Sequence, residues 1–186
     1  MPDQNAALGT SLLILARDAI GRTFGAACRP FDDLPELHAP GASFVTLTER
    51  GALRGCIGSL SAYRPLIDDV RENACAAAFS DPRFPPVRAT EFEDIRVEVS
   101  LLTPASPLFF RDEADALAQL RPHIDGVILR LHHYRATFLP QVWEQLPDPK
   151  AFLAHLKQKA GLPADYWSPD LTLERYQVEK WKEPAT

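Results

Sequence analysis

Proline limits the length of every helix and strand that this chain can form. The sequence holds 17 prolines among 186 residues, about 9% against a usual level near 5%, and only 9 glycines. Proline lacks the backbone N–H that a helix interior or a central strand needs, and it fixes φ near −65°. Because the prolines are spread along the chain, they predict many short elements joined by stiff turns.

Chain length and charge indicate how many domains the protein has and which functional classes are disfavoured. The length favours a single domain over residues 1–186, with room for a second, smaller lobe. The formal net charge is −5 and no basic run exceeds two residues, which disfavours a general nucleic-acid-binding protein. The sequence has no run of 18 apolar residues, so we expect no membrane-spanning helix.

Cysteine usage and the N-terminal pattern indicate the compartment. The three cysteines, Cys28, Cys56 and Cys75, are an odd number, which suits a reducing environment. Their spacing matches no zinc-binding pattern, so no metal site is expected. The short apolar run Leu12–Leu15 follows no basic region, unlike a secretory signal. We therefore expect a cytoplasmic protein without membrane association.

Hydrophobic periodicity predicts the order of the elements. Helical spacing and capping residues predict helices over 6–24, 65–80, 113–120 and 149–160. Alternation and β-branched residues predict strands over 43–48, 52–60, 95–103, 127–131, 135–139 and 171–181. Two of the strand pairs are separated only by short turns, so they are expected to be antiparallel hairpins. The order indicates an α+β fold, a mostly antiparallel sheet with helices packed on it.

The segment Leu53–Leu60 carries the strongest signal for chemistry. Gly55 and Gly58 flank Cys56 within a predicted strand, where glycine usually marks a bulge or a close approach of backbone or ligand. In a regular strand Arg54 lies on the same face as Cys56, and a guanidinium beside a thiol favours the thiolate. A buried structural cysteine is the competing interpretation, because free cysteine is among the most buried residue types.

Three further side chains are candidates for the same site. Arg83 and Phe84 lie in a rigid proline turn directly after a predicted helix, which suits an arginine held for an anion; the alternative is a structural ion pair with Asp81. Glu98 lies mid-strand, on the face opposite Val97 and Val99, and is a candidate acid or base. No nucleotide-binding glycine pattern or serine-hydrolase motif occurs, and no cofactor is expected.

Several segments in order resemble the AMMECR domain family, also labelled AmmeMemoRadiSam system protein A in bacteria and archaea. The resemblance covers about residues 8–182, nearly the whole chain, and its six-residue cysteine motif is highly specific. The segments that carry it are Leu53–Gly58, Asp81–Pro86, Val97–Leu102, Leu139–Val142, Lys159–Pro163 and Arg175-Tyr176.

The resemblance implies an α+β fold with a larger and a smaller lobe and a cleft near the cysteine motif. It also implies partners, because family members are often encoded with a radical S-adenosylmethionine protein and a Memo-like protein. One departure stands out: this chain has Asp125-Gly126 where the family often has His-Gly. An Arg-Gly pair that the family often has around residues 132–136 is also absent. Both departures favour a site at Cys56 rather than at the second hairpin.

Two functional hypotheses follow from these patterns. In the first, the protein is an enzyme that acts through a Cys56 thiolate on a small anionic substrate, with Arg54 stabilising charge and Glu98 as acid or base. Gly55, Gly58, Arg83 and Phe84 are then the substrate-binding residues. In the second, the protein is a non-catalytic binding or adaptor module that presents the cleft around Leu53–Gly58 to its partners.

Overall fold

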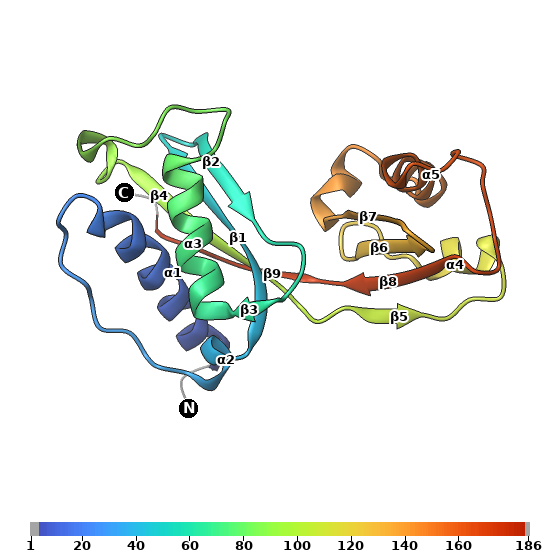
Figure 1. Ribbon diagram of the computed structural model, residues 1–186, viewed down its shortest axis with the longest axis horizontal. Coiled ribbons are helices and arrows are strands. Elements are labelled where there is room, and N and C mark those ends of the chain that lie inside the picture. Colours follow the sequence, from blue (N-terminus) through green and yellow to red (C-terminus); the bar gives the residue numbers. More distant parts are fainter. Residues whose placement is uncertain (1–3, 185–186) are drawn as a thin grey trace. The chain divides into compact units, whose positions relative to one another are not determined.

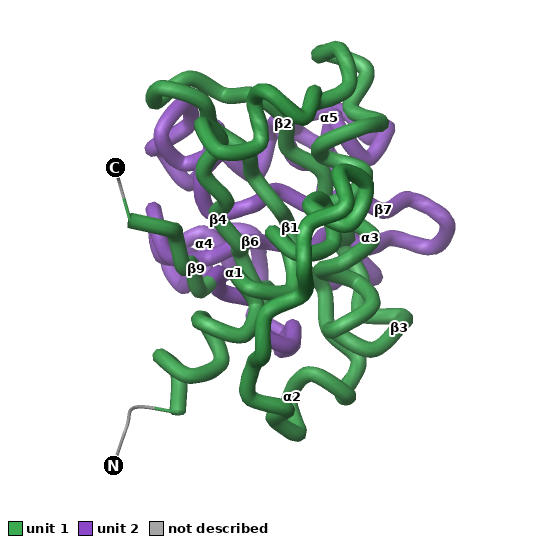
Figure 2. Tube along the Cα trace, turned by 90° about the vertical axis from the view of Figure 1, so that its left-hand side faces the viewer, with its two compact units in different colours: residues 1–102, 179–186 green, residues 103–178 purple. Residues whose placement is uncertain are grey.

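The computed structural model describes residues 4–184 and divides the chain into two compact units. The larger unit comprises residues 1–102 and 179–186, and the smaller unit comprises residues 103–178 (Figure 2). Each unit has a sheet and a hydrophobic core of its own, so each is described separately.

A five-stranded sheet forms the frame of the larger unit (Figure 1). Its order is β2 (Ala52–Gly58), β1 (Pro40–Glu49), β4 (Ile95–Leu102) and β9 (Val178–Lys182), while β3 (Arg64–Pro65) pairs with the start of β1. The strand β1 is antiparallel to both β2 and β4. This order makes β2 an edge strand.

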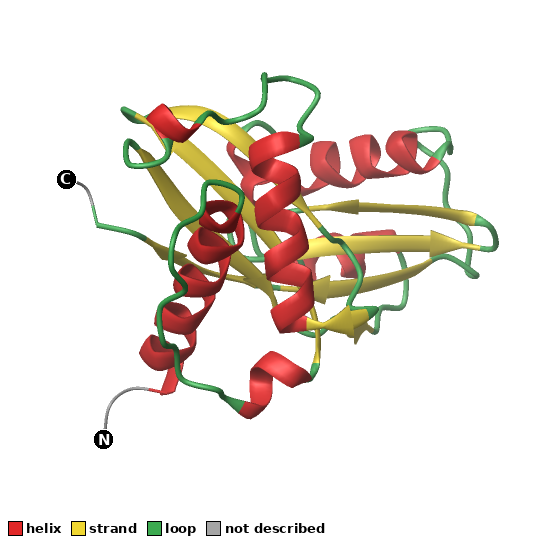
Figure 3. Ribbon diagram, turned by 60° about the vertical axis from the view of Figure 1, so that its left-hand side comes forward, coloured by secondary structure: helices red, strands yellow, loops and turns green. Residues whose placement is uncertain are grey.

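Two helices cover one face of that sheet (Figure 3). They are α1 (Gln4–Arg22) and α3 (Leu66–Phe79); the short α2 (Pro35–His38) lies in the loop before β1, and a 3₁₀ helix spans Ala89–Glu91. Their apolar residues meet the alternate residues of the strands that face them. The fully buried members of this core include Leu12, Ile20, Val45, Leu47, Val70, Val97 and Val99.

A buried polar network fastens α3 to the sheet. The carboxylate of Asp69 is completely buried and accepts hydrogen bonds from the Ser43 backbone N–H (2.8 Å) and the Ser43 hydroxyl (2.7 Å). It also accepts from the Ser59 hydroxyl at 2.6 Å, from Arg64 Nε at 2.9 Å and from Asn73 Nδ2 at 3.0 Å. These bonds join the start of β1 and the end of β2 to the first turns of α3.

The smaller unit is built on a four-stranded antiparallel sheet. Its order is β5 (Ser106–Leu108), β8 (Thr172–Tyr176), β6 (Gly126–Leu131) and β7 (Tyr134–Phe138). The strands β6 and β7 form a tight hairpin, and His132 in its turn has a φ of 51°.

Helices α4 (Glu113–Gln119) and α5 (Pro149–Ala160) complete the smaller unit, with a 3₁₀ helix over Pro140–Glu144. Asp148 caps α5 by accepting a hydrogen bond from a backbone N–H in its first turn, and Gly161 ends the helix in the left-handed conformation at φ 92°. The core of this unit centres on Trp143 and Phe152, whose rings stack with centroids 3.7 Å apart.

The expected α+β fold with mostly antiparallel sheets is confirmed. Two local predictions are wrong. The expected final strand over 171–181 is two strands, β8 and β9, which belong to different sheets and are separated by Gln177. The helix predicted over 65–80 begins one residue later, at Leu66, because Pro65 occupies the N-cap position before α3. Within residues 4–184, no helix combines the length and apolarity needed to cross a membrane.

Candidate functional site around Cys56

A clamp of two side chains holds the free edge of β2 at Cys56. The backbone N–H of Cys56 donates to the Asp81 carboxylate at 2.9 Å, and Arg83 Nη2 donates to the Cys56 carbonyl oxygen at 3.1 Å. Both groups of Cys56 point away from β1, so without the clamp they lack a sheet partner. The Asp81–Phe84 turn therefore fixes the backbone that carries the thiol.

The clamp is itself an ion pair. The Asp81 side chain is only 2% exposed, and it accepts from Arg83 Nη2 at 2.7 Å and from Arg83 Nε at 3.0 Å. These hydrogen bonds, followed by the one from the Cys56 backbone, hold the pKa of Asp81 far below its usual range. The same pair raises the pKa of Arg83. The Arg83 side chain remains 54% exposed and packs over the half-buried Phe84 ring, 5.5 Å from its centroid.

The two glycines beside Cys56 are explained by packing. A Cβ at Gly55 would lie 2.2 Å from the backbone oxygen of Ala77, so α3 approaches the strand too closely for any side chain there. A Cβ at Gly58 would lie 2.2 Å from the Phe44 ring, which crosses over that position. Both glycines thus serve close approach within the fold, and neighbouring groups already fill the space beside them.

Arg54 makes its ion pair away from the thiol. The register shifts in this part of β2, since Leu47 pairs with Gly55 and the next residue, Thr48, pairs with Leu53. Arg54 is the extra residue of this β-bulge, so the regular alternation that would place it beside Cys56 does not apply. Its buried guanidinium binds Glu91 at 3.0 Å and 3.3 Å.

The N-terminus of α3 lies away from Cys56. The C-terminal half of the helix, at Ala77, lies against Gly55, while the first turns lie at Ser43 and Ser59. The positive end of the helix dipole therefore points to the far end of β2 and gives no support to a Cys56 thiolate.

A row of three polar side chains crosses the sheet at Cys56. Thr46 on β1 pairs with Cys56 on one side and with Glu98 of β4 on the other. The distance between Thr46 Oγ1 and Cys56 Sγ is 3.3 Å, within hydrogen-bonding range for sulfur. All three residues are half-buried, and they alternate with the buried residues that face α1 and α3. The row consequently lies on the opposite face of the sheet, and Thr46 is a member that the sequence reading missed.

The Arg54–Glu91 pair predicts acid sensitivity of the Cys56 strand. The Arg54 hydrogen bond, supported by the Arg88 backbone N–H, lowers the pKa of Glu91 from 4.5 to about 2. Because the folded state binds this proton more weakly, the stabilisation is complete above pH 4.5 and is lost as pH falls toward 2. The free energy of unfolding, measured in urea, is expected to fall less steeply between pH 5 and 2.5 in Glu91→Gln than in the unsubstituted protein. An unchanged slope would contradict this role.

The other two cysteines are not members of this row. Cys28 is exposed and its sulfur accepts a hydrogen bond from Arg22 Nε at 3.3 Å. Cys75 is half-buried on α3, where burial raises the pKa of its thiol. Within residues 4–184, no three His, Cys, Asp or Glu side chains are grouped to hold a metal ion.

Asp125, where the family often has histidine, has a structural partner in the smaller unit. Its fully buried carboxylate accepts from Arg121 Nη2 at 2.6 Å and from the Arg121 backbone N–H at 2.9 Å. Its carbonyl oxygen accepts from Trp143 Nε1 at 2.7 Å. Asp125 therefore anchors the start of β6.

The fold and this site define a class of protein. Its members are α+β proteins of two units, in which an Asp-Pro-Arg turn holds the strand that carries a cysteine between two glycines. The chain belongs to the AMMECR1 family, whose model matches residues 13–181. A protein of Methanothermobacter thermautotrophicus is 41% identical over 180 residues, covering 94% of both chains. A Thermotoga maritima protein is 37% identical, covering 86% of this chain and 88% of its own.

A crystal structure supports the same relationship. An uncharacterized protein from Pyrococcus horikoshii superposes with a TM-score of 0.73 at 36% sequence identity. The match covers 92% of this chain and 89% of that one.

Proposed function

We propose that this protein is a thiol-dependent enzyme in which Cys56 Sγ reacts with, or carries, a small anionic substrate. The observation that carries the proposal is the row of Cys56, Thr46 and Glu98 on the sheet face opposite the helices. Around it, Gly55, Gly58, Asp81 and Arg54 are engaged in packing or pairing within the fold. The thiol is thus presented by a backbone that is fixed in advance, as a reacting group requires.

Arg83 is the group that suits an anionic substrate. Its guanidinium donates to the carbonyl oxygen of Cys56, and more than half of the side chain is exposed. Asp81 fixes the guanidinium through two of its nitrogens, so its direction is set before a ligand arrives. A carboxylate or phosphate bound there lies beside the thiol-bearing residue.

Glu98 is the proposed acid or base of the row. It pairs with Thr46 on the side away from Cys56, so a substrate lying across the three strands meets a carboxylate, a hydroxyl and a thiol in turn. A carboxylate in this position accepts the thiol proton through the substrate or a bridging water. If the Glu98 carboxylate acted only through its negative charge, it would instead disfavour formation of the Cys56 thiolate.

Alkylation of Cys56 in variants of the row tests the proposal. The protein is treated with iodoacetamide at pH 7, and mass spectrometry of the Cys56 peptide measures the rate of alkylation. Thr46→Val and Glu98→Gln are each expected to slow the alkylation of Cys56 at least threefold. The reason is that each substitution removes a group that accepts or shares the thiol proton. Thr48→Val, on the same strand and face, is the matched control, and the exposed Cys28 is the internal reference.

The direction of the Glu98 effect separates the two roles. Slower labelling in Glu98→Gln supports a base, whereas faster labelling shows that the carboxylate only repels the thiolate and contradicts the proposed role. Equal rates in Thr46→Val and Thr48→Val would contradict the part assigned to Thr46.

The second candidate function is a binding or adaptor module. Large apolar side chains are exposed near both ends of β2, namely Leu53 (44%), Leu60 (43%) and Tyr63 (69%). Leu60 and Tyr63 lie three residues apart in the loop after β2, and neighbouring exposed apolar side chains suit a protein interface. The partners that the resemblance implies, a radical S-adenosylmethionine protein and a Memo-like protein, are the proposed occupants. Two results together favour this function: Cys56 does not react with iodoacetamide, and the complex with either partner protein is lost in Tyr63→Ser.

A further inference from the structure

A small pocket of about 210 Å³ lies within the smaller unit, at the end of the sheet where β5 and β6 begin and β8 ends. Its lining residues all fall between positions 103 and 177, so none of them belongs to the Cys56 row. The volume is below the roughly 300–1,000 Å³ of sites for drug-sized molecules, so the pocket suits only a small ligand.

A buried carboxylate in the pocket lining is held by one arginine. Asp125 Oδ1 accepts hydrogen bonds from Arg121 Nη2 at 2.6 Å and from Arg121 Nε at 3.1 Å. The other carboxylate oxygen, Oδ2, accepts from the Arg121 backbone N–H at 2.9 Å. Arg121 and Asp125 therefore form a close ion pair in which one positive and one negative charge cancel.

A second arginine lines the same pocket without a carboxylate of its own. Arg175 lies on the face of β8 that carries the core residue Leu173, and its side chain is 34% exposed. Its Nη1 lies 4.0 Å from Asp125 Oδ2, too far for a hydrogen bond, and donates to the Gln119 carbonyl oxygen at 3.4 Å. Among residues 4–184, the Nε and Nη2 groups of Arg175 have no hydrogen-bond acceptor. Two arginines thus share one carboxylate, and one positive charge remains uncancelled.

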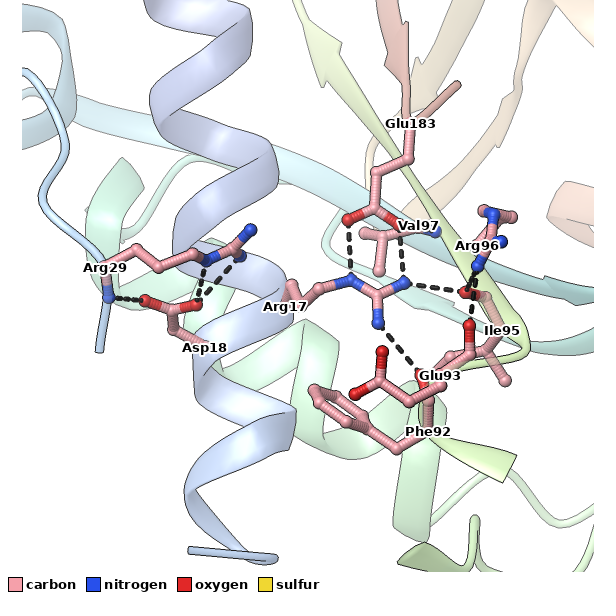
Figure 4. Close-up of polar contacts among 9 residues, drawn as sticks. All are labelled: Arg17, Asp18, Arg29, Phe92, Glu93, Ile95, Arg96, Val97 and Glu183. Atoms are coloured by element: carbon pink, nitrogen blue, oxygen red, sulfur yellow. Dashed lines mark hydrogen bonds and ion pairs between the residues drawn. The ribbon is translucent and has the colours of Figure 1, made fainter. Parts of the chain in front are cut away.

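Two arginines of the larger unit show the balanced arrangement for comparison (Figure 4). Arg17 binds Glu183 through Nε and Nη2, each at 2.6 Å. Arg29 binds Asp18 through Nε and Nη2, each at 2.8 Å. Each of these guanidiniums has its own carboxylate, whereas the carboxylate beside Arg175 already binds another arginine.

We propose that this pocket binds a small monocarboxylate through Arg175. The two oxygens of a carboxylate match the N–H groups of Nε and Nη2, which lie side by side on one edge of the guanidinium. A single negative charge cancels the one positive charge that remains, whereas a phosphate dianion brings a second charge for which the pocket has no partner. Thr103, Ser106 and Gln177 add hydroxyl and amide groups to the lining, so a short substituent fits better than a large apolar one.

Titration with three small probes tests the proposal. Propionate, the uncharged propionamide of the same size, and inorganic phosphate are each added at pH 8, where phosphate is mainly the dianion. Backbone amide NMR shifts of the full chain are followed at constant ionic strength. Propionate is expected to saturate and to shift resonances of residues 103–106, 121–125 and 175–177, and the other two probes are expected to bind at least threefold more weakly. No saturation by about 50 mM, equal affinity for propionamide, phosphate binding as tight as propionate binding, or shifts centred on residues 53–58 would overturn the proposal.

Variants of Arg175 assign the contact. Arg175→Gln is expected to weaken propionate binding at least fivefold and to abolish the preference over propionamide. Arg175→Lys keeps the charge but lacks the paired N–H groups, so its propionate affinity is expected to lie between those of Arg175→Gln and the unsubstituted protein.

Arg130→Gln is the matched control for these variants. Arg130 lies on the neighbouring strand β6, is 47% exposed and binds its own carboxylate, Glu174, at 3.0 Å, so its loss is expected to leave propionate binding unchanged. A preference for propionate that persists in both Arg175 variants, or an equal loss of affinity in Arg130→Gln, would contradict the assigned contact. None of these substitutions alters the Cys56 row, so the result is independent of the proposed thiol chemistry.

Discussion

Replacement of Asp69 by alanine is expected to destabilise the larger unit by about 3–5 kcal/mol, the usual effect of removing one partner from a buried charged pair. Asp69 is completely buried and accepts five hydrogen bonds, two from Ser43 and one each from Ser59, Arg64 and Asn73. Without the carboxylate these donors lose their acceptor inside the protein, where water does not replace it. Equilibrium unfolding in urea measures the difference.

Asp68→Ala is the matched control for this prediction. Asp68 precedes Asp69 in the same turn of α3 but is exposed, so its loss removes only a favourable charge near the helix N-terminus. We expect that variant to lose less than about 1 kcal/mol, in line with the dipole effect at exposed sites. Equal losses for the two variants would show that the buried network contributes nothing beyond the helix dipole.

Gly55→Ala is expected to cost about 1–3 kcal/mol or more, as overpacking of a tight interior does. The added Cβ would lie 2.2 Å from the backbone oxygen of Ala77, so α3 or β2 has to move. Alanine at an unhindered strand position is ordinarily the more favourable residue, because glycine loses more conformational freedom on folding. A loss of stability in Gly55→Ala therefore indicates close packing at this position, whereas a gain indicates open space.

Gly58→Ala serves as the comparison for Gly55→Ala. Its added Cβ meets the side-chain ring of Phe44, which can change its rotamer, whereas Ala77 presents backbone. We expect Gly58→Ala to be the milder substitution in the same urea unfolding measurement. A milder effect for Gly55→Ala would mean that α3 does not hold its place against β2.

The first hairpin shows how far the sequence predicts the site. The β-branched strand and the turn around Gly51 place both strands correctly. A regular antiparallel ladder that starts from the Glu49–Ala52 pair at the turn would place Thr46 opposite Gly55. In the structure Thr46 pairs with Cys56 instead. The difference is the bulge at Arg54. At the bulge, the Arg54 side chain binds Glu91, 37 residues later in the chain, a contact that local periodicity does not encode.

Arg54 and Arg83 illustrate the same limit for side-chain roles. The sequence places both near Cys56, but it does not reveal which acceptor each guanidinium takes. Arg83 binds the Cys56 carbonyl oxygen and Asp81, whereas Arg54 binds Glu91. The proline turn supplies the constraint for Arg83, because its rigid backbone fixes where the side chain starts. The partner of Arg54 is determined by tertiary packing alone.

The break in the last predicted strand has a tertiary cause as well. Residues 171–181 have a continuous strand-like pattern, yet β8 pairs with β5 and β6, whereas β9 pairs with β4. At the break, the Gln177 backbone binds Thr103 through both its N–H and its carbonyl oxygen. Local alternation predicts that each half is a strand and contains no information on which sheet it joins.

The most direct test of the central claim, that Cys56 is the functional group, is its alkylation rate at pH 7 in the native protein and in urea. A half-buried thiol without activation reacts more slowly when folded, because the fold restricts access to it. We predict that native Cys56 reacts at least as fast as the same residue in the unfolded chain, and faster than Cys28. A native rate a hundredfold below the unfolded rate would show a sealed structural cysteine and would contradict the proposed function.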